Sequence, residues 1–294
     1  MVNYSRISII YNPNSTGNSK AMAAELQKSL RPKFPDLKIE RIPTKYVGHA
    51  RELACQIAKS AKCPLIVSSS GDGGYNEVVN GVMDAGNPSA ITAVLPAGNA
   101  NDHSRTMQDN PLSVEIKKGI VTQIDLIKVT AKGPKLEPVT RYAHSYVGLG
   151  LTPVIATELN KHTLNAFKEI LLVLKTFRKY RPFRIKHKGK VFRLDSLLFG
   201  NINQMAKVLT LAPENRPDDG KFEVVTFPSS HKRKLVKKLV KAAVSNLNTT
   251  RRETSYVFIA IRKMPMQLDG EVMELKGGSE VTVESAHKAL ATII

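Results

Sequence analysis

The chain has no tryptophan, only two cysteines and few acidic residues for its number of basic ones. Its strongly apolar runs are short, like the one at 170–174, whereas a bilayer-spanning helix needs about 20 such residues. The N-terminal residues show no signal-type apolar core, so we expect a cytoplasmic protein. Cys55 and Cys63 have no metal-type spacing and no accompanying histidine cluster, which indicates reduced structural thiols.

The shortage of acids leaves a net charge of +19, from 44 lysines and arginines against 25 aspartates and glutamates. Such a charge favours an anionic partner: nucleic acid, an acidic membrane face or a phosphorylated ligand. Many of the cations cluster at 161–193 and 232–241. A solvated basic face kept for solubility would explain the clusters equally well. We find no helix-turn-helix, zinc-finger or aromatic stacking signature, which argues against nucleic acid.

The order of apolar patterns predicts two domains, and 294 residues are enough for both. Residues 1–125 alternate strand and helix patterns, which is typical of an α/β domain with a mainly parallel sheet. Residues 126–287 are mostly strand-like, with turns at glycines and two helical stretches, and they predict an antiparallel β-sandwich domain. The expected helices are 20–30, 49–60, 76–85, 163–179 and 232–248.

A glycine-rich segment from Ser70 to Gly74 lies between an apolar strand and an amphipathic helix. Glycines there let a ligand approach the backbone closely, and the N–H groups of a helix N-terminus form an anion site. An acid in such a loop can position Mg²⁺. The segment matches neither familiar phosphate motif: there is no G-x-x-x-x-G-K-[ST], and Asn76 stands where G-x-G-x-x-G needs glycine.

Two further loops of this type follow neighbouring strands, one at 95–102 and one at 11–18. Ligands of open α/β sheets bind at the carboxyl ends of the parallel strands. We therefore expect all three loops to converge on one edge of the sheet.

Together the loops resemble those of the family that contains diacylglycerol kinases, sphingosine and ceramide kinases, and similar bacterial lipid kinases. The family pattern reads N-P-x-S-G, then G-G-D-G-T-x-N-E-V, then P-x-G-T-x-N-D, and the chain follows it in order. The resemblance covers nearly the whole length, because later segments also match: 44–50, 123–126, 211–221 and 268–271.

The resemblance implies ATP as phosphoryl donor and Mg²⁺ as cofactor on an α/β nucleotide domain, to which the tail 288–294 returns. By position, the residues implied to hold ATP are Asn12, Pro13, Thr44, Gly71, Asp72, Gly73, Gly74, Asn76, Glu77, Gly98, Asn99 and Asp102. Those implied around the catalytic Mg²⁺ are Asp72, Asp102 and Asp125. A second, structural metal is implied at Asp219, with backbone groups near Arg216 and Lys221.

In the second domain the resemblance makes Glu271 the general base on the acceptor hydroxyl, with Asp269 beside it. An alcohol nucleophile needs such a carboxylate to accept its proton. Out of this context, Asp-Gly-Glu would be read as an ordinary hairpin turn.

The implied activity is ATP-dependent phosphorylation of the hydroxyl of diacylglycerol or a related membrane lipid, in phospholipid metabolism. We expect the protein to dock peripherally on the anionic inner membrane face, where each basic residue contributes about 1 kcal/mol. The residues expected to face the membrane are Lys175, Arg178, Lys179 and Arg181. A homodimer is compatible with the sequence. The alternatives are a kinase of a soluble metabolite, as in NAD kinases, and a catalytically weak kinase fold that binds membranes.

Three positions depart from the family pattern. Ser70 replaces the first glycine of G-G-D-G-T, Gly74 replaces its threonine, and Asn99 replaces the threonine of P-x-G-T. Two hydroxyls expected to contact the nucleotide are therefore missing. A lost hydrogen bond to a charged phosphate costs about 1.5–3 kcal/mol, so we expect weaker ATP binding rather than none.

Overall fold

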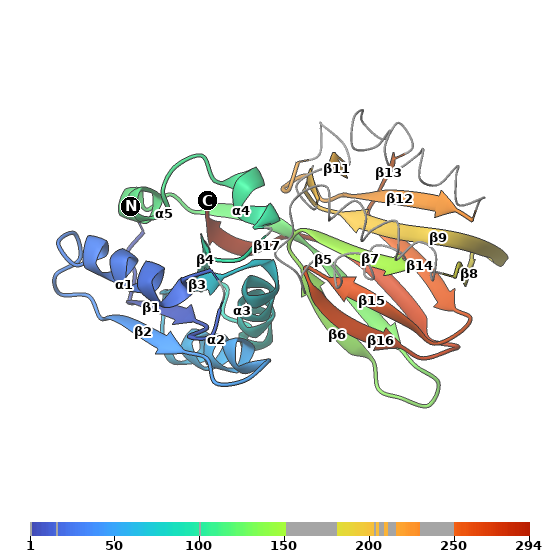
Figure 1. The fold of residues 1–294 in the computed structure, drawn as a ribbon, viewed down its shortest axis with the longest axis horizontal. Coiled ribbons are helices and arrows are strands. Elements are labelled where there is room, and N and C mark those ends of the chain that lie inside the picture. The colour runs from blue at the N-terminus through green and yellow to red at the C-terminus, as the bar shows by residue number, and fades with distance from the viewer. Residues whose placement is uncertain are drawn as a thin grey trace. The chain divides into compact units, whose positions relative to one another are not determined.

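The computed structural model describes residues 2–15, 17–99, 101–150, 181–202, 204–205, 209–210, 216–229 and 250–294 (Figure 1). The helices expected at 163–179 and 232–248 lie outside the described residues, as do Lys175, Arg178 and Lys179. The chain divides into two compact units: unit 1 comprises 1–125 and 288–294, and unit 2 comprises 126–287.

A parallel sheet forms the centre of unit 1. Its strand order is β2–β1–β3–β4–β17, with the last strand contributing only its final residues. The bounds are β1 (Arg6–Tyr11), β2 (Ile39–Pro43), β3 (Pro64–Ser70), β4 (Ile91–Pro96) and β17 (Glu280–Ile293). Alternate side chains point to opposite faces, and both faces of the central strands are buried, as expected of a parallel sheet covered by helices.

Helices cover both faces of this sheet (Figure 1). Apolar side chains of α1 (Ser19–Leu30) and α5 (Leu112–Lys118) form one core cluster with alternate residues of the strands. The helices α2 (His49–Ser60) and α3 (Asp72–Ala85) pack against each other and against the sheet, while α4 (Asp102–Met107) follows β4.

Unit 2 is built of antiparallel strands around a second apolar core. Its pairing follows the order β16–β15–β7–β9–β8–β14–β17, while β12 pairs with β9 and β13, and β5 pairs with β6 and β17. The bounds are β5 (Thr122–Lys132), β6 (Val139–Ala143), β7 (Tyr146–Gly150), β8 (Phe183–His187), β9 (Lys190–Gly200), β10 (Gln204–Met205), β11 (Leu209–Thr210), β12 (Phe222–Pro228), β13 (Thr250–Glu253), β14 (Ser255–Ala260), β15 (Met264–Leu268) and β16 (Glu271–Leu275). The expected combination of an α/β part and a β-rich part is confirmed.

The strand β17 belongs to both units. Its first residues pair with β14 in unit 2, and its last residues, from Ala291 to Ile293, pair in parallel with β4 in unit 1. Inside unit 1 the Tyr75 hydroxyl lies 3.0 Å from Oγ1 of Thr92 and 3.1 Å from Oγ1 of Thr292. This buried hydrogen-bonded group attaches the tail to both β4 and α3.

Cys55 and Cys63 are both free thiols, as expected. Burial raises the pKa of the Cys63 thiol, so little thiolate is present near neutral pH. Among the helices that the structure describes, none is long and apolar enough to cross a membrane.

Candidate active site

Three loops of unit 1 meet at the carboxyl ends of the parallel strands. A Cβ on Gly98 would lie 2.4 Å from the Cα of Gly71, so the loops after β4 and β3 pass backbone against backbone. A Cβ on Gly17 would similarly collide with the carbonyl oxygen of Ala97. Any side chain at these glycines would separate the loops, which explains why glycine stands there.

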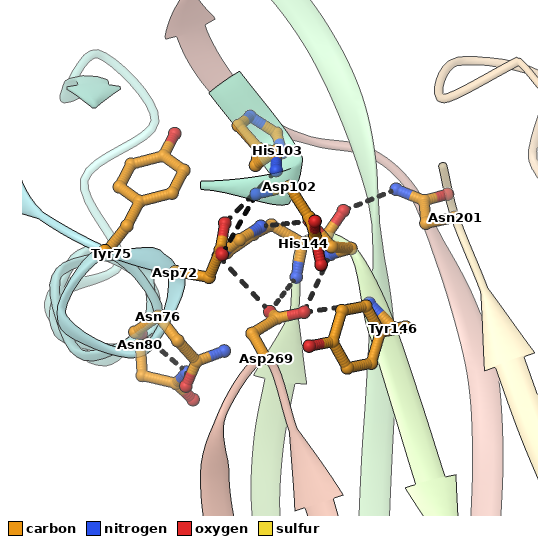
Figure 2. A network of polar contacts seen from close by, with 12 residues as sticks. Asp72, Tyr75, Asn76, Asn80, Asp102, His103, His144, Tyr146, Asn201 and Asp269 are labelled. Atoms are coloured by element: carbon orange, nitrogen blue, oxygen red, sulfur yellow. Dashed lines mark hydrogen bonds and ion pairs between the residues drawn. The ribbon is translucent and has the colours of Figure 1, made fainter. Parts of the chain in front are cut away.

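The Asp72 carboxylate joins the first glycine-rich segment to α4 (Figure 2). Its oxygens accept hydrogen bonds from the backbone N–H groups of Asp102, at 3.0 Å, and His103, at 3.1 Å. Asp102 is fully buried, and its carboxylate pairs with Arg105 at 2.5 Å. Asp72 therefore accepts hydrogen bonds from the first N–H groups of α4, which have no partner within the helix, and it fixes the position of both acids.

The segment expected to be a loop before residue 76 is partly helical, because α3 begins at Asp72. The N–H of Tyr75 donates to the carbonyl of Gly71 at 3.1 Å, which closes the first turn. Gly73 and Gly74 thus lie in the first helical turn, where backbone N–H groups have no partner within the helix and are suited to bind an anion.

Glu77 anchors the loop that follows β2. Its two carboxylate oxygens accept hydrogen bonds from the N–H of Gly48, at 2.9 Å, and of Ala50, at 3.1 Å. At the start of that loop, the N–H of Thr44 donates to the carbonyl of Tyr11 at 2.8 Å. We interpret Glu77 as a residue that positions this loop, although the sequence pattern suggested a direct contact with ATP.

The other residues implied to hold ATP differ in exposure. Asn76 is buried, and its carbonyl and side-chain oxygens lie 2.9 and 3.1 Å from Nδ2 of Asn80 (Figure 2). Asn12, Pro13 and Asn99 are exposed. These three exposed residues are accessible to a ligand. Asn76 instead stabilises the helix that carries the glycine-rich turn.

In unit 2 the Asp-Gly-Glu segment forms the tight turn between β15 and β16. Asp269 and Gly270 both have positive φ, 47° and 102°, and Leu268 is paired with Glu271. Two left-handed residues between paired strands are typical of two-residue hairpins, for which Asp-Gly is a favoured sequence. The turn places Glu271 at the start of β16, where it is partly exposed.

The Asp269 carboxylate is fully buried and holds the start of β7 (Figure 2). It accepts hydrogen bonds from three successive backbone N–H groups, those of His144 at 2.6 Å, Ser145 at 3.0 Å and Tyr146 at 2.8 Å. Three such bonds satisfy a carboxylate whose burial would otherwise be costly. Asp269 thus fixes the hairpin against the start of β7.

Sequence reasoning missed the group that surrounds Asp269. Asn201 donates from Nδ2 to the carbonyl of His144 at 3.1 Å, and its N–H donates to the carbonyl of Ser145 at 2.8 Å. Nδ1 of His144 lies 2.7 Å from the Ser145 hydroxyl. The only signal in the sequence was an asparagine at the end of an expected strand, and its partners are more than 50 residues away.

The acids implied around the catalytic Mg²⁺ have different surroundings. Asp72 and Asp102 lie next to each other, joined by the bond from the Asp102 N–H to Asp72, and a Mg²⁺ held mainly by phosphates needs only one or two carboxylates. The third acid, Asp125, accepts a hydrogen bond from the N–H of Lys288 at 2.6 Å and thereby joins β5 to β17. In the described part of the chain, no three His, Cys, Asp or Glu side chains form a metal-binding group.

At Asp219, where a second metal is implied, both carboxylate oxygens have protein partners. One of its carboxylate oxygens accepts from the N–H of Lys221 at 3.0 Å, and the other pairs with Nη2 of Arg252. Nε of Arg252 lies 3.1 Å from the buried carboxylate of Glu223, its cross-strand partner. A guanidinium thus bridges the two acids. Arg216 is exposed and pairs with Asp218 at 3.3 Å.

Comparison with known proteins agrees with this geometry. Residues 6–129 match the diacylglycerol kinase catalytic domain. The match ends just inside unit 2 and covers less than half of the chain. A diacylglycerol kinase of Staphylococcus aureus is 26% identical to this chain over 243 residues, which cover 77% of the chain and 71% of the relative.

Solved structures show the same fold. A diacylglycerol kinase from Bacillus anthracis covers the entire chain and matches over 98% of its own length, at 20% identity and a TM-score of 0.71. Yeast NADH kinase in complex with NADH covers 99% of the chain and matches over 83% of its own length, at 10% identity and a TM-score of 0.55. At these identities the likeness shows the fold.

Proposed function

We propose that this kinase transfers the γ-phosphoryl group of ATP to the hydroxyl of diacylglycerol or a closely related membrane lipid. The observation that carries the proposal is the meeting of three loops at the carboxyl edge of the unit 1 sheet, with glycines at each close approach. Phosphoryl transfer demands mainly positioning and charge stabilisation, which backbone N–H groups at such an edge supply.

Glu271 is the proposed general base. In the transfer, a bond forms between the acceptor oxygen and the γ-phosphorus while the bond from that phosphorus to the bridging oxygen breaks, which releases ADP. The hydroxyl proton passes to the Glu271 carboxylate. The partial exposure of Glu271 permits access to a substrate. Asp269, two residues before it, is fully buried and accepts hydrogen bonds from three backbone N–H groups.

Asp72 and Asp102 are the proposed carboxylates for Mg²⁺. When bound, the ion would neutralise phosphate charge. Asp72 itself is held by two N–H groups of α4, so the protein orients this acid before any ligand arrives.

The net charge of +19 supports docking on an anionic membrane, where the lipid substrate resides. Of the residues proposed to face the membrane, Arg181 is the one within the described part of the chain, and it is exposed.

The proposal is tested by transfer of labelled γ-phosphate from Mg-ATP into phosphatidylglycerol vesicles that carry a panel of hydroxyl lipids. Glu271→Gln removes the base and should lower transfer at least a hundredfold, because general-base catalysis contributes about 10²–10⁴. Glu274→Gln is the matched control, since Glu274 lies on the same strand and is exposed. Its activity should equal that of the wild type.

The panel also separates the alternatives. Label in one lipid that disappears with Glu271→Gln identifies the substrate and the base together. Label in a soluble acceptor such as NAD, with none in lipid, would refute the lipid assignment. ATP binding without transfer to any acceptor would favour a membrane-binding protein on a kinase fold.

A further inference from the structure

Positions 70 and 74 lie so close together that the side chain at one limits the side chain at the other. Ser70 is the last residue of β3, and Gly74 lies in the first turn of α3. A Cβ built on Gly74 would lie 2.7 Å from both the Cβ and the Oγ of Ser70, which is closer than packed side-chain atoms come. A side chain at position 74 therefore requires glycine at position 70, and the serine at 70 requires glycine at 74.

The two departures from the G-G-D-G-T pattern are thus a single exchange. Where the pattern has glycine first and threonine fifth, this chain has serine first and glycine fifth. The Ser70 hydroxyl lies within 3 Å of the place that a β-carbon at position 74 would take. The hydroxyl has moved from the helix to the end of the strand, but it still lies beside position 74.

The Ser70 hydroxyl is also positioned and able to donate. Its oxygen lies 2.7 Å from the hydroxyl oxygen of Ser68, and it donates to the carbonyl of Gly71 at 2.9 Å. Ser68 can donate to Ser70, which leaves the hydrogen of Ser70 for another acceptor. The Gly71 carbonyl keeps its bond from the N–H of Tyr75 when that hydrogen turns away.

We propose that Ser70 is a nucleotide-binding residue, whose hydroxyl donates to a phosphate oxygen of the nucleotide in place of a hydroxyl at position 74. The inference rests on the proposed function, because it assumes that Mg-ATP binds at the start of α3. It assigns the missing contact to a residue on the strand, and it explains how nucleotide binding survives a glycine at position 74.

The test is a set of variants whose affinity for Mg-ADP and a non-hydrolysable ATP analogue is measured by calorimetry. Ser70→Ala keeps the Cβ and removes only the hydroxyl. It should weaken nucleotide binding about ten- to a hundredfold, the effect of one hydrogen bond to a charged group. The melting temperature should fall by only a few degrees, because the neutral hydrogen bond to Ser68 is lost. Ser70→Gly with Gly74→Thr returns the hydroxyl to the helix and should bind within about threefold of the wild type. Gly74→Thr alone should lower the melting temperature, because its Cβ meets Ser70.

Two results would overturn the inference. Ser70→Ala with wild-type affinity would mean that the hydroxyl does not contact the nucleotide. A double variant that binds no better than Ser70→Ala would mean that the two hydroxyls are not interchangeable. Failure of the part of the proposed function on which this inference rests, ATP binding at the start of α3, is distinguishable, since the wild type would then bind neither nucleotide.

Discussion

Replacing Asp269 with asparagine should destabilise unit 2 while leaving the shape of the side chain almost unchanged. The wild-type carboxylate accepts two N–H groups, of Ser145 and Tyr146, on Oδ1 and one, of His144, on Oδ2. An amide oxygen in the first place retains two hydrogen bonds but without the charge. The amide nitrogen then faces the N–H of His144, so two donors oppose each other.

The magnitude follows from these three bonds. Loss of charge weakens each retained bond by about 1 kcal/mol, and an unsatisfied buried N–H costs about 1–3 kcal/mol. The free energy of unfolding of unit 2 should therefore fall by about 3–5 kcal/mol. The total free energy of unfolding of most domains is only about 5–15 kcal/mol, so this loss should be easy to measure.

Differential scanning calorimetry is the suitable assay, because the two units can unfold in separate transitions. A loss of this size should lower the transition of unit 2 by roughly 6–20 °C. Glu271→Gln, in the same hairpin, should melt like the wild type although it abolishes transfer. An Asp269→Asn variant with wild-type melting and no activity would refute the reasoning and assign Asp269 a chemical role.

Three further outcomes are expected. Glu77→Gln should weaken nucleotide binding about three- to tenfold, as measured by calorimetry, because the loop after Thr44 loses a charged anchor; unchanged affinity would remove that loop from the site. Arg252→Gln should lower the free energy of unfolding, measured in urea, by about 1–3 kcal/mol, because Glu223 loses its bridging cation. A chelator should leave the melting temperature of the wild type unchanged. A melting temperature that falls with chelator would indicate a metal at that position. Burial raises the pKa of Tyr4 to about 12, so its contribution to stability is present below pH 10 and is lost as the pH rises through 12. Tyr4→Phe should reduce this alkaline loss in melting curves recorded from pH 9 to 12, and an unchanged slope would contradict the assignment.

Much of unit 1 could be predicted because its information is local. Apolar residues at helical spacing predicted α2 at His49–Ser60 without error, and α1 to within one residue. The start of α3 was wrong by four residues because Gly73 and Gly74 have low helix propensity. Packing between strand ends overrides that propensity, and no local pattern reports it.

The site could be predicted in outline for a related reason. Parallel strands bring their carboxyl ends together, so the convergence of three loops follows from topology. The partners of individual carboxylates do not follow in this way. Glu77 accepts from residues 27 and 29 positions away, and Asp269 from residues 123–125 positions away. Which backbone group meets a given carboxylate depends on the register and twist of distant strands.

The dual membership of β17 has a consequence for synthesis on the ribosome. Until residues 291–293 emerge, β4 is an edge strand, with an unpaired row of N–H and C=O groups. The roughly 160 residues of unit 2 must be translated first, which takes about 8–30 s at typical rates. Unit 1 of the nascent chain is therefore exposed to strand addition by other chains during that interval, and it becomes complete only after unit 2 has been made.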